Sequence, residues 1–260
     1  MFLTVALLIS AQSAHISNDI KNRDSAQIDS RESKLEKAVA SEEWLELGTL
    51  LKNPADRQEF DNDLMWLQRK TFAGSSAFLS LSYGAGLWHM ASAISDEPQK
   101  RQVQGTALAM HLYAIALVNI DGPQCVDKTA PLHRMDQLMS YTPGIWDFAA
   151  SMSDAERAQV MQIVLVLEQK TAAKRLESGD ANFLCRDGMS QIAFGLANGT
   201  TKEVEPQPGQ FGRQINVDDG GKYKPEVVSK EEWGKVAATR RAGLKDAINA
   251  ILDVRKPVKK

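Results

Sequence analysis

The densest group of reactive side chains lies in the stretch DGPQCVDKTAPLHRMDQL, residues 121–138, which holds Cys125, Asp127, His133 and Asp136. A cysteine nucleophile needs a histidine base within hydrogen-bond reach, and that histidine needs an orienting group. His133 and Asp136 are three residues apart, so a helix would place them on one face. The stretch is therefore a candidate catalytic site for a hydrolase of the cell envelope that uses Cys125, His133 and Asp136.

The same residue types also suit two other structures. Cysteine, histidine and aspartate can bind a metal together, but a C-x-D pair followed by His133 matches no metal or protease spacing. In the alternative structure Asp127 accepts hydrogen bonds from nearby backbone N–H groups, and Thr129 and Pro131 start a helix. His133 and Asp136 then belong to the polar face of that helix. We assign no metal ligand and no cofactor from the sequence.

The chain has two cysteines, Cys125 and Cys185, and each follows the expected end of a helix. In an exported protein, two cysteines most simply form one disulfide. The bridge would close a loop of about 60 residues and stabilise the fold by roughly 4 kcal/mol. A bonded Cys125 could not act as a nucleophile.

Residues 1–14, MFLTVALLISAQSA, predict a signal peptide, because an apolar run is followed by small residues at the positions that a signal peptidase reads. No lysine or arginine precedes the run, which departs from the usual pattern, and a buried N-terminal helix is the alternative. We expect a periplasmic or secreted protein, with residues 15–40 as a polar leader.

Composition and periodicity predict an all-α fold, a multi-helix bundle of helical hairpins with its core domain over residues 41–198. Hydrophobic residues make up 43% of the chain and charged residues 25%, as in soluble globular proteins. Residues 71–95 and 102–120 carry no charge and are long enough to span a membrane. Their serines, glycines and histidines favour central buried helices instead, and we expect no integral membrane segment once the signal is removed.

Further along the chain, Ser153 and Glu156 have the spacing of a capping box and predict the start of a long helix. A final core helix is expected over about 187–197. Gly84 and Gly86 lie within a helical pattern and predict close packing of two helices.

The C-terminal part differs in composition. Residues 199–228 are rich in proline and glycine and predict a long connecting loop, and residues 229–260 predict a basic amphipathic helix that packs on the core. Residues 222–260 hold eleven Lys/Arg against five Asp/Glu, whereas the whole chain has a net charge of -2, which gives no case for nucleic acid. The candidate binding residues are Phe211, Tyr223, Arg240, Arg241 and Lys245. The alternative is a connector followed by a packed terminal helix.

No P-loop, dinucleotide-binding glycine motif, H-E-x-x-H or G-x-S-x-G elbow occurs in the sequence. Function resides in sites rather than in folds. We therefore predict a non-enzymatic exported helical protein that binds another macromolecule, most simply a protein, as an adaptor, inhibitor or accessory factor. The envelope hydrolase that uses residues 121–138 is the alternative.

Overall fold

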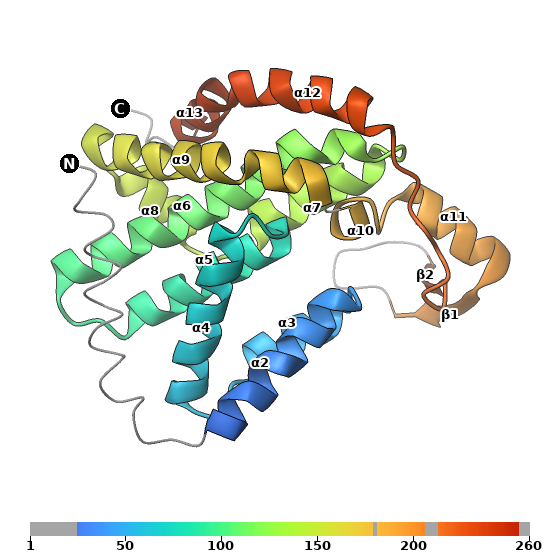
Figure 1. Cartoon of the computed structure of the whole chain (residues 1–260), viewed down its shortest axis with the longest axis horizontal. Helices are drawn as coiled ribbons and strands as arrows, with labels where there is room; N and C mark the ends of the chain where they lie inside the picture. Colours follow the sequence, from blue (N-terminus) through green and yellow to red (C-terminus); the bar gives the residue numbers. More distant parts are fainter. Residues whose placement is uncertain (1–24, 179–180, 206–212, 255–260) are drawn as a thin grey trace. The chain divides into compact units, whose positions relative to one another are not determined.

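The computed structural model describes residues 25–178, 181–205 and 213–254 (Figure 1). The expected signal peptide at 1–14 and the candidate Phe211 lie outside them. Most of the described chain is helical, and the sheet that it contains has two strands, so the prediction of an all-α, multi-helix fold is confirmed.

The chain divides into two compact units, residues 1–66 and 67–260. The first holds α2 (Ser25–Ala40), α3 (Trp44–Lys52) and the first part of α4 (Arg57–Phe72). The second holds the end of α4, then α5 (Ala77–Ser92), α6 (Glu97–Asp121), the 3-10 helix η2 (Gly122–Gln124), α7 (Thr129–Ser140), α8 (Ile145–Ser151), α9 (Asp154–Ser178), α10 (Ala181–Leu184), α11 (Met189–Asn198), β1 (Thr200–Val204), β2 (Gln214–Asp218), α12 (Lys230–Ala242) and α13 (Leu244–Val254).

The first unit includes much of the expected polar leader. Leu35 on α2 is buried, and the guanidinium of Arg31 pairs with the carboxylate of Asp63 on α4 at 2.8 Å. The indole N–H of Trp66 donates to Glu36 at 2.9 Å. Residues 25–40 are therefore a packed helix of this unit, because Leu35 and Ala38 are buried and Arg31 and Glu36 find partners on α4.

The centre of the second unit is the hairpin of α5 and α6. A Cβ on Gly84 would lie 3.0 Å from the carbonyl oxygen of Ala107 and 3.1 Å from the Cβ of Met110, so the glycine lets the two backbones approach closely. The segment of α6 and η2 is long and apolar enough to cross a bilayer, yet 78% of its most apolar window is buried within the fold. That burial is what a central core helix requires.

Helices α7, α8, α9, α12 and α13 pack around α6. The capping box predicted at the start of α9 is confirmed: the N–H of Ser153 donates to Glu156 at 2.7 Å, and the N–H of Glu156 donates to the Ser153 hydroxyl at 3.3 Å. Arg101, near the start of α6, also pairs with Glu156, and this pairing joins the starts of two long helices that lie side by side.

The expected single C-terminal helix is interrupted at Gly243, which separates α12 from α13. Leu244, Ile248 and Leu252 are buried at helical spacing on α13. The buried guanidinium of Arg157 donates to the carbonyl of Leu252 at 2.7 Å and so closes the end of α13 against α9. The terminal segment packs on the core, as α12 on α6 and α13 on α9.

The expected connecting loop contains the hairpin of β1 and β2, in which Thr201 faces Val217. A Cβ on Gly195 of α11 would lie 2.5 Å from the Cγ1 of Val217, so this glycine seats α11 on the hairpin. Farther on, the N–H of Val228 donates to the carbonyl of Gln124 at 2.8 Å. Val227 pairs with Cys125 in an isolated antiparallel bridge, so the end of the connection is held against the loop that carries Cys125.

Candidate functional site

The two cysteines form a disulfide, which confirms the sequence prediction. The Cα atoms of Cys125 and Cys185 are 5.2 Å apart, and both residues are fully buried. The bridge joins the loop after η2 to the loop after α10. Because the sulfur of Cys125 is bonded, Cys125 is neither a nucleophile nor a metal ligand in this fold.

Asp127 and Thr129 cap the start of α11, the helix that follows Cys185. Asp127 accepts a hydrogen bond from the N–H of Ser190 at 2.8 Å, and the hydroxyl of Thr129 accepts one from the N–H of Met189 at 2.8 Å. These are two of the orphan donors at the start of α11. Asp127 also accepts from the N–H of Thr129, at the start of α7. Partial burial works to raise the pKa of the Asp127 carboxyl, but these hydrogen bonds outweigh it, and the net effect is a lowered pKa.

Gly188 lies at the N-cap position of α11, next to the capping carboxylate. A Cβ there would collide with the Asp127 carboxylate and would lie 2.8 Å from the Cβ of Ala130. The absence of a side chain therefore lets the α10–α11 loop approach α7.

His133 and Asp136 are both exposed on α7, and no hydrogen bond in the described chain joins them. The Nε2 of His133 lies 3.0 Å from the side-chain nitrogen of Gln137. The structure therefore does not bring Cys125, His133 and Asp136 together as a nucleophile, a base and an orienting group. No group of three or more metal-ligating side chains occurs among the residues that the structure describes.

Helix α11 is largely exposed, so the prediction of a core helix at about 187–197 is wrong. Gly195 is its only buried residue. Met189, Ile192 and Leu196 lie on one face with exposed fractions of 60%, 41% and 54%. The periodicity identified an apolar face correctly, but no described element of the second unit covers that face. We define Met189, Ile192 and Leu196 as the α11 face.

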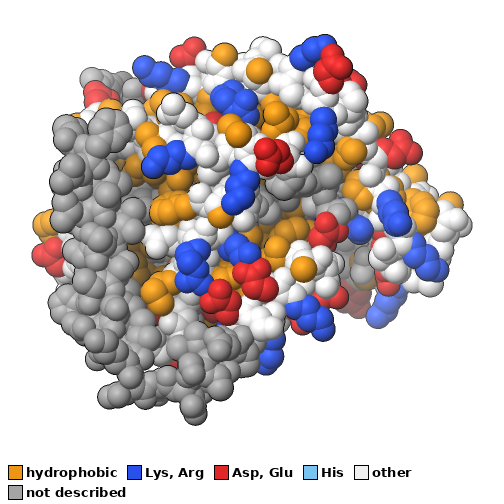
Figure 2. All heavy atoms as spheres, viewed as in Figure 1, with side chains coloured by type: hydrophobic (Ala, Val, Ile, Leu, Met, Phe, Trp, Pro, Cys, Tyr) orange, Lys and Arg blue, Asp and Glu red, His pale blue; other side chains and the backbone are white. Residues whose placement is uncertain are grey.

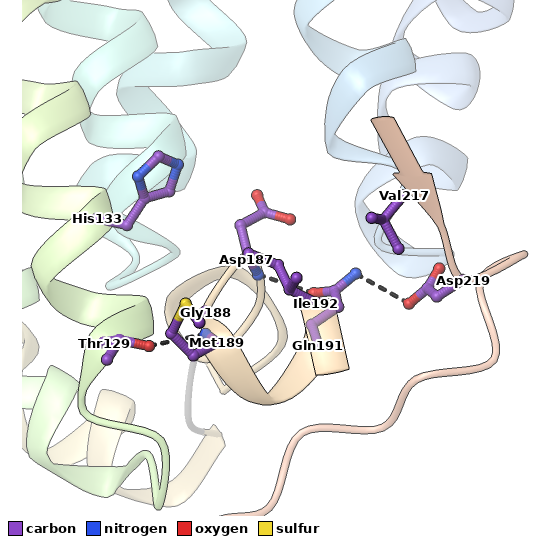
Figure 3. Close-up of a pocket in the computed structure, with 9 residues that line it drawn as sticks. All are labelled: Thr129, His133, Asp187, Gly188, Met189, Gln191, Ile192, Val217 and Asp219. Carbon is purple, nitrogen blue, oxygen red and sulfur yellow. Dashed lines mark hydrogen bonds between the residues drawn. The ribbon is translucent and has the colours of Figure 1, made fainter. Parts of the chain in front are cut away.

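A hollow of about 380 Å³ opens beside the α11 face (Figure 3). In Figure 3, His133 of α7 lies on one side, Val217 and Asp219 lie on the other, and the start of α11 lies between them. Its lining residues come from three parts of the chain: Thr129, His133, Asp187, Gly188, Met189, Gln191, Ile192, Val217 and Asp219. The hollow thus has an apolar floor and carboxylates on its walls.

Hydrogen bonds hold the polar walls of the hollow. Gln191 donates to Asp219 at 2.9 Å and accepts from the N–H of Asp187 at 2.8 Å. Asp187 has a positive φ of 62°, and its carboxylate pairs with the buried guanidinium of Arg134 at 2.7 Å. Such a backbone conformation is strained for a residue other than glycine and persists where its surroundings enforce it. Arg134 also donates to the carbonyl of Phe183, so it fixes the loop beside the disulfide.

The four described candidate binding residues of the C-terminal part do not form one surface. Tyr223 is buried, with its ring against Phe194. Arg240 donates to Asn119 of α6 at 2.6 Å, whereas Lys245 is exposed on α13. On the face in Figure 2, the described blue and red side chains over α12 are mixed and form no continuous basic area.

Arg241 completes a buried charged cluster between α6, α9 and α12. It donates to Glu168 at 2.6 Å, and the other carboxylate oxygen of Glu168 accepts from Arg175. Arg175 also pairs with Asp121 at 2.8 Å and donates to the hydroxyl of Tyr113. Burial works to lower the pKa of Arg175, but Asp121, Tyr113 and Glu168 together raise it. Arg240 and Arg241, which were expected to contact a partner, therefore hold α12 against α6 and α9 of the same chain.

Sequence reasoning singled out Thr129 and His133 but missed four other residues that line the hollow. Asp187, Gln191, Val217 and Asp219 lie in segments whose local patterns indicate only a helix start, a connection and a turn. The α11 face was visible as an apolar repeat of three and four residues, but the repeat does not tell whether the face is buried.

No protein family model matches the chain, and no curated protein and no solved structure shows significant similarity to it. Its function is therefore argued from its own residues alone.

Proposed function

We propose that this protein is an exported, non-enzymatic binding protein, which contacts another protein through the α11 face and the adjoining hollow. The observation that carries the proposal is the exposure of Met189, Ile192 and Leu196 on one side of a single helix. Apolar side chains that gather at the surface next to a hollow are typical of sites that bind other proteins.

The supports of α11 favour a preformed surface. The disulfide fixes the loop before the helix, Asp127 and Thr129 cap its first turn, and Gly195 seats it against Val217. A surface that is ordered before binding loses less conformational entropy when a partner arrives. Holding three apolar side chains in a fixed geometry is thus useful for recognition.

The disulfide also supports the proposal that the protein is exported. Disulfides form and persist in oxidising compartments and are rare in reducing ones. The Cys125–Cys185 bond is consistent with a periplasmic or secreted protein, as is the apolar run at residues 2–9.

A photo-crosslinking residue placed at Ile192 in the native host tests the proposed function. The matched control carries the same residue at Leu45, which is 88% exposed but lies in the other unit. We expect a discrete crosslinked protein from position 192 that is absent from position 45, and its loss when Leu196→Asp is added. Identical products from both positions, or a product that Leu196→Asp leaves unchanged, would contradict the proposal.

A further inference from the structure

We infer that the segment of the partner protein that binds the α11 face and the hollow carries apolar side chains flanked by lysine or arginine. The inference rests on the proposed function and adds the chemistry of the partner. Two properties of the hollow carry it: an apolar floor that continues onto the α11 face, and two carboxylates. Asp187 pairs with Arg134 through one oxygen, whereas Asp219 accepts from the neutral N–H groups of Gln191 and Gly221.

The apolar part of the site is continuous along the helix. Met189 and Ile192 belong both to the lining of the hollow and to the α11 face, and Leu196 extends the face by one further turn. Val217 of β2 faces them from the other side of the hollow (Figure 3). A partner can therefore insert one side chain into the hollow and lay a second along α11, which buries apolar area at both points.

The charged part of the site is acidic. Asp187 and Asp219 are the charged lining residues, beside the single histidine His133. Arg134 pairs with one oxygen of Asp187 from behind, and Gln191 donates to one oxygen of Asp219. Each carboxylate keeps acceptor capacity for a further donor. A lysine or arginine of a partner can cover the apolar floor with its aliphatic stem and place its charge between these walls.

The same charges disfavour other occupants. Carboxylates repel the phosphates of nucleic acid and of anionic lipid headgroups, so a polyanion would lose affinity at this hollow. A basic peptide segment gains both the apolar contact and the charge contact. Electrostatic complementarity of this kind contributes to specificity more than to raw affinity.

The test uses the full oxidised chain and three fluorescent synthetic peptides of equal length, read by fluorescence anisotropy. The first has a Leu/Phe core flanked by lysines, the second the same core flanked by glutamates, and the third a serine core flanked by lysines. We expect the first peptide to bind roughly tenfold more tightly than each of the others, as two partly exposed charge pairs and a small apolar anchor would give.

Two variants assign the effect to the site. Asp219→Asn keeps the shape of the wall and an acceptor for Gln191, leaves the pair of Asp187 with Arg134 intact, and should abolish most of the preference for lysine over glutamate flanks. Ile192→Asp should weaken the first peptide by more than roughly tenfold, whereas Leu45→Asp should leave it unchanged. Circular dichroism and a thermal melt of each variant establish that the fold is retained.

The possible failures are distinguishable. If lysine-flanked and glutamate-flanked peptides bind equally, the inferred partner chemistry is overturned while binding at the α11 face stands. If none of the peptides binds, or if Ile192→Asp and Leu45→Asp act alike, the inference is also overturned, and the crosslinking result from position 192 then decides the proposed function separately. Self-association of the chain that Ile192→Asp abolishes would make a second copy the occupant and would contradict the inference.

Discussion

The carboxylate of Asp127 accepts hydrogen bonds from Thr129 and from the backbone N–H of Ser190, which lies 63 residues farther along the chain. One aspartate thus serves the starts of both α7 and α11. Residues 121–138, the stretch densest in reactive side chains, therefore lie where two loops are joined. The Cys125–Cys185 disulfide and the Asp127 carboxylate make the two connections.

Replacing Asp127 tests this shared capping role. We expect Asp127→Ala to lower the free energy of unfolding by about 1–3 kcal/mol, because two helix starts lose an acceptor. Asp127→Asn keeps one acceptor oxygen and should cost less. Urea unfolding measures both variants, with Asp136→Ala, an exposed aspartate on α7, as the matched control. Equal losses for Asp127→Ala and Asp136→Ala would contradict the assignment.

Removing the disulfide should destabilise the fold as a whole. The double variant Cys125→Ala, Cys185→Ala releases a closed loop of 60 residues, and we expect it to unfold at a lower urea concentration, with a loss of about 2–4 kcal/mol. Wild-type protein unfolded in the presence of a reductant provides the control and should match the variant. A reductant that leaves the wild-type midpoint unchanged would show that the bridge contributes nothing.

The two arginines of the buried cluster should differ in their cost. Arg175→Met leaves Asp121 buried beside Glu168 without its guanidinium, and we expect a loss of about 3–5 kcal/mol. Arg241→Met should cost only about 1 kcal/mol, because the Arg241 side chain is one-third exposed and Glu168 keeps Arg175. Thermal or urea unfolding of both variants checks the order, and a reversed order would contradict the assigned roles.

His111 makes the stability of the fold sensitive to mild acid. It is buried on α6 with its ring edge-on to Trp146, and burial, partly offset by the backbone of Leu138, lowers its pKa to about 4. Below its ordinary value of 6.5 the unfolded chain binds the proton first, so this residue's contribution to stability falls between pH 6.5 and 4 and then levels off.

The size of this effect is up to about 3 kcal/mol over that pH interval. A His111→Gln variant is neutral at all these pH values, so its unfolding free energy should fall less than that of the wild type between pH 7 and pH 4. Urea unfolding at the two pH values measures the difference. Parallel losses in the two proteins would exclude His111 as the cause.

Much of the helical core could be predicted from the sequence because its determinants are local. The charge-free stretch that became α6 and the capping box of Ser153 and Glu156 both depend on residues within a few turns of one another. The glycine at position 84 is likewise visible within its own helical pattern, although the helix that it packs against is a separate one. The disulfide was also predictable, since two cysteines in a chain that is expected to be exported leave a single intramolecular pairing.

The hollow and the role of α11 depend on contacts between distant segments. The repeat of Met189, Ile192 and Leu196 shows that one face is apolar, but its exposure follows from where α7 and the hairpin place the helix. The inward role of Arg241 likewise follows from Glu168, which is 73 residues away. The pattern of charge along α12 does not distinguish a surface that docks within the chain from one that meets a partner.

The position of the disulfide also determines how the molecule responds to a protease. A cut between α7 and α8 falls inside the loop closed by Cys125 and Cys185, so the two fragments stay covalently joined until the bond is reduced. A cut within the β1–β2 hairpin falls outside that loop. The piece that carries α12 and α13 is then retained by packing and by non-covalent bonds, among them those of Arg241 to Glu168, Arg240 to Asn119 and Arg157 to Leu252 and the pairing of Val227 with Cys125. It therefore separates in denaturant without any reductant.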